Sequence, residues 1–171
     1  MATLADLIRD IPDFPKEGIL FKDITTLLHD AAAFRQAIDE LEARCRPYGA
    51  TKVVGIESRG FIFAAPLADR LGAGFVPARK LGRLPAETVR AEYALEYGTN
   101  TVEMHRDAID PGERVLIVDD LLATGGTCRA SIDLVEQLGG VVVGCAFLIE
   151  LTFLDGRAAL PGYEIQALLS Y

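Results

Sequence analysis

Short apolar, β-branched runs alternate along this chain with segments in which apolar residues repeat at helical spacing. We predict strands at residues 52–56, 74–78, 101–105, 115–118, 141–149 and 164–169. Helical periodicity predicts helices at 31–46, 61–71 and 128–138. Strands that alternate with helices are typical of an α/β fold with a mainly parallel sheet. We expect about five strands flanked by helices, in one domain.

Two segments fall outside this alternation. Leu4, Leu7, Ile8 and Ile11 predict a short amphipathic helix near the start, and the Pro- and Phe-containing stretch 11–28 reads as an ordered loop. That loop either covers a site or packs on the core as a strap. Residues 79–98 show no period and carry many charges, so we expect a long loop there, which is either functional or disordered.

The stretch 115–127 combines a buried strand, two acids and a glycine-rich turn. Asp119 and Asp120 follow the expected end of the strand, and their carboxylates could accept hydrogen bonds from sugar hydroxyls. The small residues after them leave backbone N–H groups uncovered at the start of a helix, where a phosphate binds well. These residues are Ala123, Thr124, Gly125, Gly126 and Thr127.

This stretch lacks the lysine of a nucleotide P-loop and the glycine spacing of a dinucleotide-binding fold. A plain turn with a solvated acidic pair is the structural alternative. For the glycine-rich turn alone the two readings would be even, but its combination with the strand and both acids is more specific for a phosphate site. Two further loops follow expected strands and carry cations. Arg59 lies in a tight turn at 57–60, and Arg79, Lys80 and Arg83 open the long loop.

Composition narrows the choice of function. The net charge is −8 at pH 7, which argues against nucleic acid as a partner. The three cysteines are far apart and without metal-binding spacing, so we expect neither disulfide nor zinc. The N-terminus has no signal-peptide pattern, and the longest apolar run, 141–149, is too short to span a membrane. A cytoplasmic protein without membrane contact is the default expectation.

Four motifs in order and at matching spacing resemble the adenine phosphoribosyltransferases, a branch of the type I phosphoribosyltransferases. They lie at 14–25, 55–63, 95–98 and 118–127, so the resemblance covers roughly residues 11–150. It implies the type I phosphoribosyltransferase fold, with an N-terminal hood at 1–30, a core at 31–171 and a flexible lid at about 79–100. It also implies formation of AMP and pyrophosphate from adenine and 5-phosphoribosyl 1-pyrophosphate (PRPP), with Mg²⁺ carried by the substrate and no direct protein ligand.

The resemblance assigns roles to the motif residues. The cradle 123–127 with Asp119 and Asp120 would hold ribose 5-phosphate, and Leu20, Phe21 and Lys22 would read adenine. Pyrophosphate would bind at Glu57, Ser58, Arg59, Arg79, Lys80 and Arg83. Glu96 would act as the acid or base and Arg59 would assist catalysis, while Tyr97 would order the closed lid. A cis peptide at Glu57–Ser58 and a homodimer, whose partner supplies one lid cation, are further implications.

Two positions depart from the pattern. Leu81 stands where many relatives carry a basic residue, and Lys22 stands where many have Arg. The identity of the lid cation that contacts pyrophosphate is therefore open. A phosphoribosyltransferase for another nucleobase and a non-catalytic regulator that senses PRPP are the alternative functions. A purely structural domain would leave Arg59, the acidic pair and the cradle unexplained together.

Overall fold

The computed structural model describes residues 3–95 and 97–171, and the chain divides into two compact units. One unit runs up to Glu40 and the other is Leu41–Tyr171. The single domain with a hood at 1–30 stays a prediction. Among the described residues, no helix has both the length and the apolar character needed to cross a membrane.

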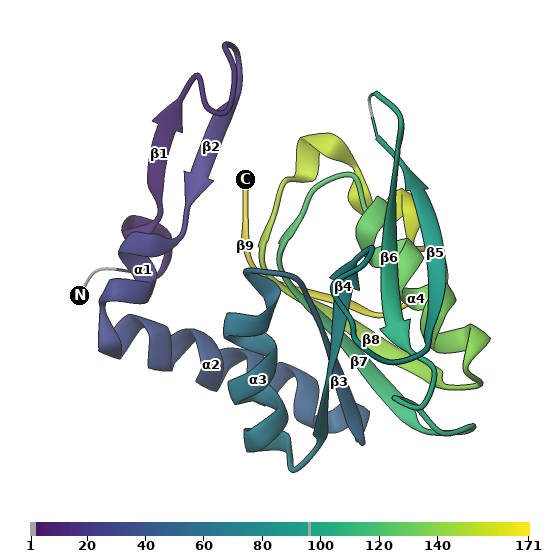
Figure 1. Ribbon diagram of the computed structural model, residues 1–171. Coiled ribbons are helices and arrows are strands. Elements are labelled where there is room, and N and C mark those ends of the chain that lie inside the picture. Colours follow the sequence, from purple (N-terminus) through teal and green to yellow (C-terminus); the bar gives the residue numbers. More distant parts are fainter. Residues whose placement is uncertain (1–2, 96) are drawn as a thin grey trace. The chain divides into compact units, whose positions relative to one another are not determined.

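The first unit is built on an antiparallel hairpin (Figure 1). Strand β1 (Arg9–Pro12) pairs with β2 (Leu20–Asp23), after a single 3₁₀ turn, η1 (Ala5–Leu7). Helix α1 (Thr25–His29) follows, and α2 (Ala31–Cys45) begins in this unit. The expected helix at 3–11 is therefore wrong, because residues 9–12 form backbone hydrogen bonds with strand 20–23 instead of with each other. The expected loop at 11–28 likewise contains β2 and α1.

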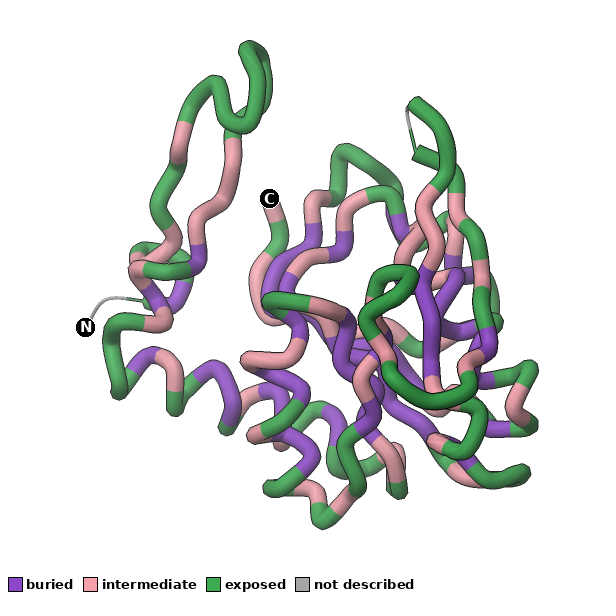
Figure 2. The backbone as a smooth tube through the Cα atoms, in the orientation of Figure 1, coloured by how far each residue is buried: buried purple, intermediate pink, exposed green. Residues whose placement is uncertain are grey.

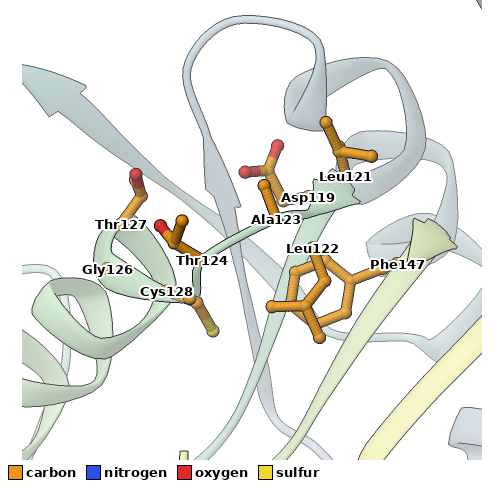
Figure 3. Close-up of a pocket in the computed structure, with 10 residues that line it drawn as sticks. Asp119, Leu121, Leu122, Ala123, Thr124, Gly126, Thr127, Cys128 and Phe147 are labelled. Carbon is orange, nitrogen blue, oxygen red and sulfur yellow. The ribbon is translucent and has the colours of Figure 1, made fainter. Parts of the chain in front are cut away.

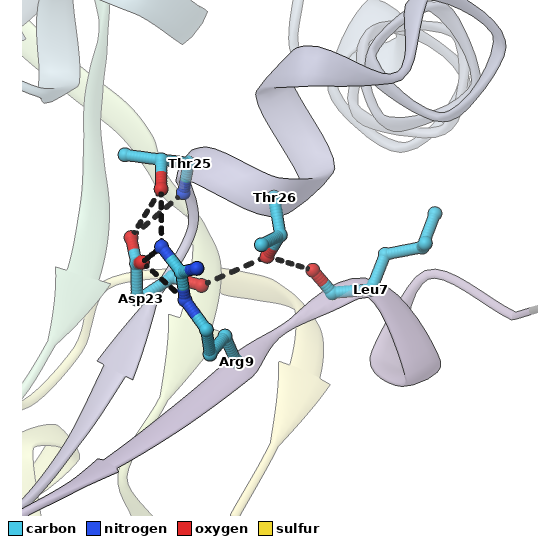
Figure 4. A network of polar contacts seen from close by, with 5 residues as sticks. All are labelled: Leu7, Arg9, Asp23, Thr25 and Thr26. Carbon is cyan, nitrogen blue, oxygen red and sulfur yellow. Dashed lines mark hydrogen bonds and ion pairs between the residues drawn. The ribbon is translucent and has the colours of Figure 1, made fainter.

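A polar network ties the base of this hairpin together (Figure 4). Arg9 Nη2 lies 2.5 Å from Asp23 Oδ2, and the Thr25 N–H donates to Asp23 Oδ1 at 2.9 Å. These hydrogen bonds, the one from the Thr25 N–H first, lower the pKa of Asp23 to about 2. The Thr26 hydroxyl donates to the Leu7 carbonyl at 2.5 Å. The hairpin, η1 and α1 are thus joined by side-chain hydrogen bonds.

Within the described residues of the second unit, seven strands form one sheet in the order β5-β6-β4-β3-β7-β8-β9. The parallel part consists of β4 (Gly74–Lys80), β3 (Lys52–Ile56), β7 (Arg114–Leu122), β8 (Val141–Glu150) and β9 (Ile165–Ser170). These are five of the six predicted strands, with ends that differ by a few residues, and the sixth, predicted at 101–105, is also a strand. The expected α/β architecture with a mainly parallel sheet is confirmed.

The segment expected to be a long loop folds differently. β4 continues to Lys80, and β5 (Thr88–Ala94) pairs antiparallel with β6 (Thr99–His105) along its whole length. β6 meets β4 only at Arg79 and Lys80. Val89, Ala91 and Tyr93 pack on the core while Arg90 and Glu92 face away, so an alternating strand signal was present. Charged and small residues of low strand propensity concealed it.

Alternate residues of the central strands pack against helices on the two faces of the sheet (Figure 1). Val54, Ile117 and Cys145 join the cluster beneath α4 (Gly126–Gln137). Helix α3 (Gly60–Leu71) packs on β3, β4 and β7, and it comes so close that a methyl group at Gly55 would lie 2.7 Å from Ala64 Cβ. Figure 2 shows buried positions concentrated along these strands. Short 3₁₀ turns complete the unit: η2 (Arg46–Tyr48), η3 (Thr152–Leu154) and η4 (Gly156–Ala159).

Asp30 caps helix α2. The N–H groups of Ala32 and Ala33 donate to Asp30 Oδ1 at 2.9 and 3.0 Å. Asp30→Ala removes this acceptor and should lower the free energy of unfolding by about 1 kcal/mol. Asp30→Asn keeps an acceptor oxygen and serves as the control. Urea unfolding curves measure both, and equal losses in the two variants would show that the cap is not the cause.

Candidate active site

The parallel pairing of β3 with β7 brings two polar segments to the same edge of the sheet. Gly55 is in register with Val118, so the turn after β3 lies beside the end of β7. β7 runs four residues beyond Val118, to Leu122. Asp119 and Asp120 therefore lie inside the strand rather than after it, which corrects the expected strand end. Their position is fixed by pairing with β8, where Asp119 opposes Phe147.

Arg59 and Asp120 form the central ion pair of this edge. Arg59 Nε lies 2.6 Å from Asp120 Oδ2, and the Asp120 side chain is nearly buried. Burial disfavours the charge on Arg59, but the hydrogen bond and charge of Asp120 outweigh it and raise the pKa of the guanidinium. About half of the Arg59 side chain is exposed, 51 %. A charged donor group is thus held at the edge with surface still open to a ligand.

Asp119 occupies a different environment from its neighbour. Its Oδ1 accepts a hydrogen bond from the Asp120 N–H at 2.8 Å, and a methyl group at Gly60 would lie 2.8 Å from the same oxygen. Burial, with the charge of Asp120 as the second cause, raises the pKa of the Asp119 carboxyl well above its usual range. Burial thus disfavours the charge on Asp119, while Asp120 is paired with Arg59.

The cradle between β7 and α4 is lined by the predicted residues (Figure 3). Ala123, Thr124, Gly125, Gly126 and Thr127 surround a pocket of ≈ 70 Å³ together with Asp119. This volume has room for a group the size of a few water molecules, such as a phosphate. Within the described part of the chain, nothing accepts a hydrogen bond from the N–H groups of 123–125. The first amides of α4 also lack intrahelical partners, so several donors can meet at this point.

Gly125 makes the turn into α4 possible. Its φ of +87° is the left-handed conformation that favours glycine. A methyl group there would also lie 2.5 Å from the Gly156 carbonyl oxygen. The cradle is therefore shaped both by local backbone geometry and by a segment remote in the sequence.

A second cationic group surrounds Glu57. Arg79 donates from Nε and Nη2 to the Glu57 carboxylate at 3.2 and 3.1 Å, and the Lys80 N–H donates at 3.0 Å. Partial burial acts to raise the pKa of Glu57, but these hydrogen bonds and the charges of Arg79 and Arg83 lower it. The structure thus brings together four of the residues predicted for pyrophosphate. The peptide between Glu57 and Ser58 is cis, as the resemblance implies.

The residues predicted for adenine lie in the first unit, on β2. Phe21 packs edge to face on Phe14, with ring centroids 5.1 Å apart. Lys22 Nζ lies 2.6 Å from Asp10 Oδ1, and Leu20 is half exposed. Ile11, Phe14, Phe21 and Asp23 line a shallow pocket on this hairpin. An apolar wall with a carboxylate at its rim can hold a flat aromatic ring.

Two further predicted residues, Glu96 and Tyr97, belong to the expected lid. Glu96 lies outside the described residues. Tyr97 is 84 % exposed, the most open large apolar side chain among those described. Its predicted role in ordering the closed lid stays a prediction.

Sequence reasoning missed several residues that contact the cradle. Leu121, Leu122, Cys128 and Phe147 line the pocket, and Tyr93 of β5 lies beside Gly126. The Cys128 side chain points toward the interior (Figure 3), where a hydrogen bond with Cys145 and burial raise the thiol's pKa. It is therefore an inert packing group. In the described ranges, no group of three or more His, Cys, Asp or Glu side chains is placed to hold a metal ion.

Comparisons with known proteins agree with this architecture. The Phosphoribosyl transferase domain family matches residues 25–159. An adenine phosphoribosyltransferase from Roseiflexus sp. (strain RS-1) is 60 % identical over 168 residues, which cover 98 % of each chain. The crystal structure of adenine phosphoribosyltransferase from Thermoanaerobacter pseudethanolicus superposes with a TM-score of 0.96 at 56 % identity, covering 99 % of this chain and 100 % of that chain.

A third relative was solved with ligands. The Saccharomyces cerevisiae adenine phosphoribosyltransferase, complexed with adenine and an imino-altritol bisphosphate, has a TM-score of 0.93 at 40 % identity over 96 % of both chains. Likeness at this level extends over the hairpin unit, the cradle and the paired strands alike. The chain therefore belongs to the phosphoribosyltransferases of the type I fold, and within them to the adenine phosphoribosyltransferases.

Proposed function

We propose that this protein transfers the phosphoribosyl group of PRPP to adenine, giving AMP and pyrophosphate in purine salvage. The observation that carries the proposal is the amide cradle beside a buried acidic pair, next to an arginine turn, in a chain of the adenine branch. The anomeric carbon loses its bond to pyrophosphate and gains one to an adenine nitrogen. The adenine proton leaves to a base.

The cradle 123–127 binds the 5′-phosphate in this proposal. Each charge contact at a helix end contributes about 0.3–1 kcal/mol when exposed, so several amides must act together. Asp119 and Asp120 accept hydrogen bonds from the ribose hydroxyls. Because Asp120 also holds Arg59, the sugar and the pyrophosphate-binding turn are fixed by the same carboxylate.

The cations around the turn stabilise the leaving pyrophosphate. Arg59 and the Ser58 turn face it, and charge that develops there meets preorganised donors. Glu57 accepts three hydrogen bonds from Arg79 and Lys80, which points to a role in orienting Arg79 rather than in touching an anion. Lys80 and Arg83 add positive charge at the same edge of an acidic protein. In the homodimer that we propose, the partner subunit supplies one lid cation.

Mg²⁺ would come with the substrate PRPP rather than occupy a site built by the protein. The residues fit such a substrate-borne ion better than a resident one, because Asp120 is already paired with Arg59 and burial disfavours the charge on Asp119. The ion supplies charge neutralisation of the leaving group. The chain's own residues hold the sugar and the anion on either side of it.

The hairpin of the first unit reads adenine in this proposal. Backbone groups of Leu20 and Lys22 match the N6 donor and N1 acceptor of the base, and Phe21 stacks on its ring. Glu96 serves as acid or base at the imidazole nitrogens, and Tyr97 orders the lid that excludes water. A cytoplasmic homodimer is the setting we propose. A 6-oxopurine carries an acceptor at position 6, where adenine carries a donor. This difference distinguishes adenine from the main alternative, which is another nucleobase as substrate.

The first test is the reaction itself. Purified protein with Mg²⁺, PRPP and adenine should form AMP and pyrophosphate, measured by chromatography, whereas hypoxanthine and guanine should give little product. A folded sample that makes no AMP from adenine would reject the proposal. Binding of PRPP without turnover of any base would instead favour a regulator that senses PRPP.

The double variant Asp120→Asn with Thr124→Ala should lower kcat/KM for PRPP about a hundredfold or more, because it removes contacts to both ribose and phosphate. Steady-state rates measure the loss, and circular dichroism checks the fold. Asp69→Asn, on the exposed end of α3, is the matched control and should leave the rates unchanged. Near-normal rates in the double variant would mean that the sugar phosphate binds elsewhere.

Glu96→Gln tests the acid–base assignment. If Glu96 accepts the adenine proton, the wild-type rate falls at low pH as this carboxylate is protonated, and the Gln variant should be slow and lack that acidic limb. Glu92→Gln, an exposed residue on β5, is the matched control and should keep the wild-type profile. The same acidic limb in both variants would remove Glu96 from the chemistry.

A further inference from the structure

A segment that none of the four motifs contains lies directly against the phosphate cradle. We call it the backing segment, and it comprises η3 and η4 (residues 152–159). A methyl group at Gly156 would lie 2.4 Å from the Ala123 carbonyl oxygen and 2.9 Å from Leu122 Cδ1. In return, a methyl group at Gly125 would lie 2.5 Å from the Gly156 carbonyl oxygen. The two backbones are thus in contact at a pair of glycines.

Packing, rather than backbone conformation, explains the glycine at 156. Its φ lies outside the left-handed region, so a larger residue could adopt its backbone. The atoms that a side chain would strike belong to the cradle's own backbone and to buried Leu122, neither of which is a flexible side-chain end. The position of the backing segment therefore limits where Ala123 and Gly125 can lie.

The backing segment is itself anchored to the sheet. Arg157 donates from Nε and Nη2 to the two carboxylate oxygens of Glu150, both at 2.8 Å. Glu150 is the last residue of β8 and is almost buried, and the hydrogen bonds from Arg157 lower its pKa. The Leu151 N–H donates to the Leu122 carbonyl at 2.9 Å, and Leu160 beyond the segment is buried. A bidentate pair of this kind fixes orientation as well as distance.

We propose that Gly156, held by the Glu150–Arg157 pair, is a positioning residue that sets the geometry of the phosphate cradle. This inference rests on the proposed function, because it assigns the cradle to the 5′-phosphate. Gly156 touches no substrate and acts through Ala123 and Gly125. A displacement of the cradle backbone that is small compared with an N–H···O distance would misalign several amides at once. The affinity for the phosphate would then fall more than the affinity for an anion at the arginine turn.

Gly156→Ala tests the proposal by comparing two ligands. Titration calorimetry should show ribose 5-phosphate bound about tenfold or more weakly, as expected for a small displacement of a binding group. Pyrophosphate with Mg²⁺ should bind as in the wild type, and KM should rise for PRPP but not for adenine. Gly74→Ala is the matched control. Gly74 is the first residue of β4, and its added methyl group would meet only the flexible Lys52 side chain, at 3.2 Å.

A second variant covers the case in which Gly156→Ala does not fold. Glu150→Gln weakens the anchor without adding a methyl group and should give the same selective loss for ribose 5-phosphate, smaller in size. Unchanged ribose 5-phosphate affinity in a folded variant would overturn the inference, and so would an equal loss for both ligands accompanied by a fall in Tm. If the wild type itself fails to bind ribose 5-phosphate, the proposed function fails instead.

Discussion

The parallel pairing of β3 with β7 is the constraint on which the rest of this structure depends. It aligns Gly55 with Val118, so that the arginine turn after β3 and the acidic end of β7 meet at one edge of the sheet. Close contact follows at Gly60, where a side chain would collide with Asp119. The Arg59–Asp120 pair, the different surroundings of the two acids and the entry into the cradle all follow from that register.

At this edge of the sheet, carboxylates are paired with arginines whose side chains stay partly exposed. The protein carries a net charge of −8, yet Asp120 and Glu57 are each paired with an arginine, and burial disfavours the charge on Asp119. Local repulsion of an anionic ligand is thereby reduced without any change in the overall charge. The remaining donors, which are the amides of the cradle and the outer atoms of the guanidinium groups, suit a ligand with phosphates at both ends.

The antiparallel hairpin β5–β6 explains why the predicted lid is more ordered than a loop. Gly82 donates its N–H to Glu103 at 3.0 Å and Thr88 donates its hydroxyl to the same carboxylate at 3.2 Å. Glu103 is buried and also pairs with Arg90 at 2.9 Å. Its carboxylate thus joins the turn after β4 to both strands of the hairpin.

Local patterns in the sequence were enough to predict the parallel strands, the helices α2 to α4 and the cradle. Each is encoded by neighbouring residues: β-branched runs, helical periodicity, the Asp30 cap, and a glycine at 125 where φ must be positive. Strands β1, β2 and β5 and the extension of β7 to include Asp119 and Asp120 were not predicted. Their residues acquire strand geometry only from partners elsewhere in the chain, against weak local propensity.

The same distinction applies to the site. The acids, Arg59 and the cradle residues could be named from their order along the chain, since a chemical pattern survives without coordinates. The pairing of each cation with its carboxylate could not be predicted from the sequence, and neither could the need for glycine at position 156. Both depend on contacts between segments far apart in the sequence. Sequence alone therefore determined what chemistry this protein carries, while tertiary packing decided which atoms of it come within hydrogen-bonding distance.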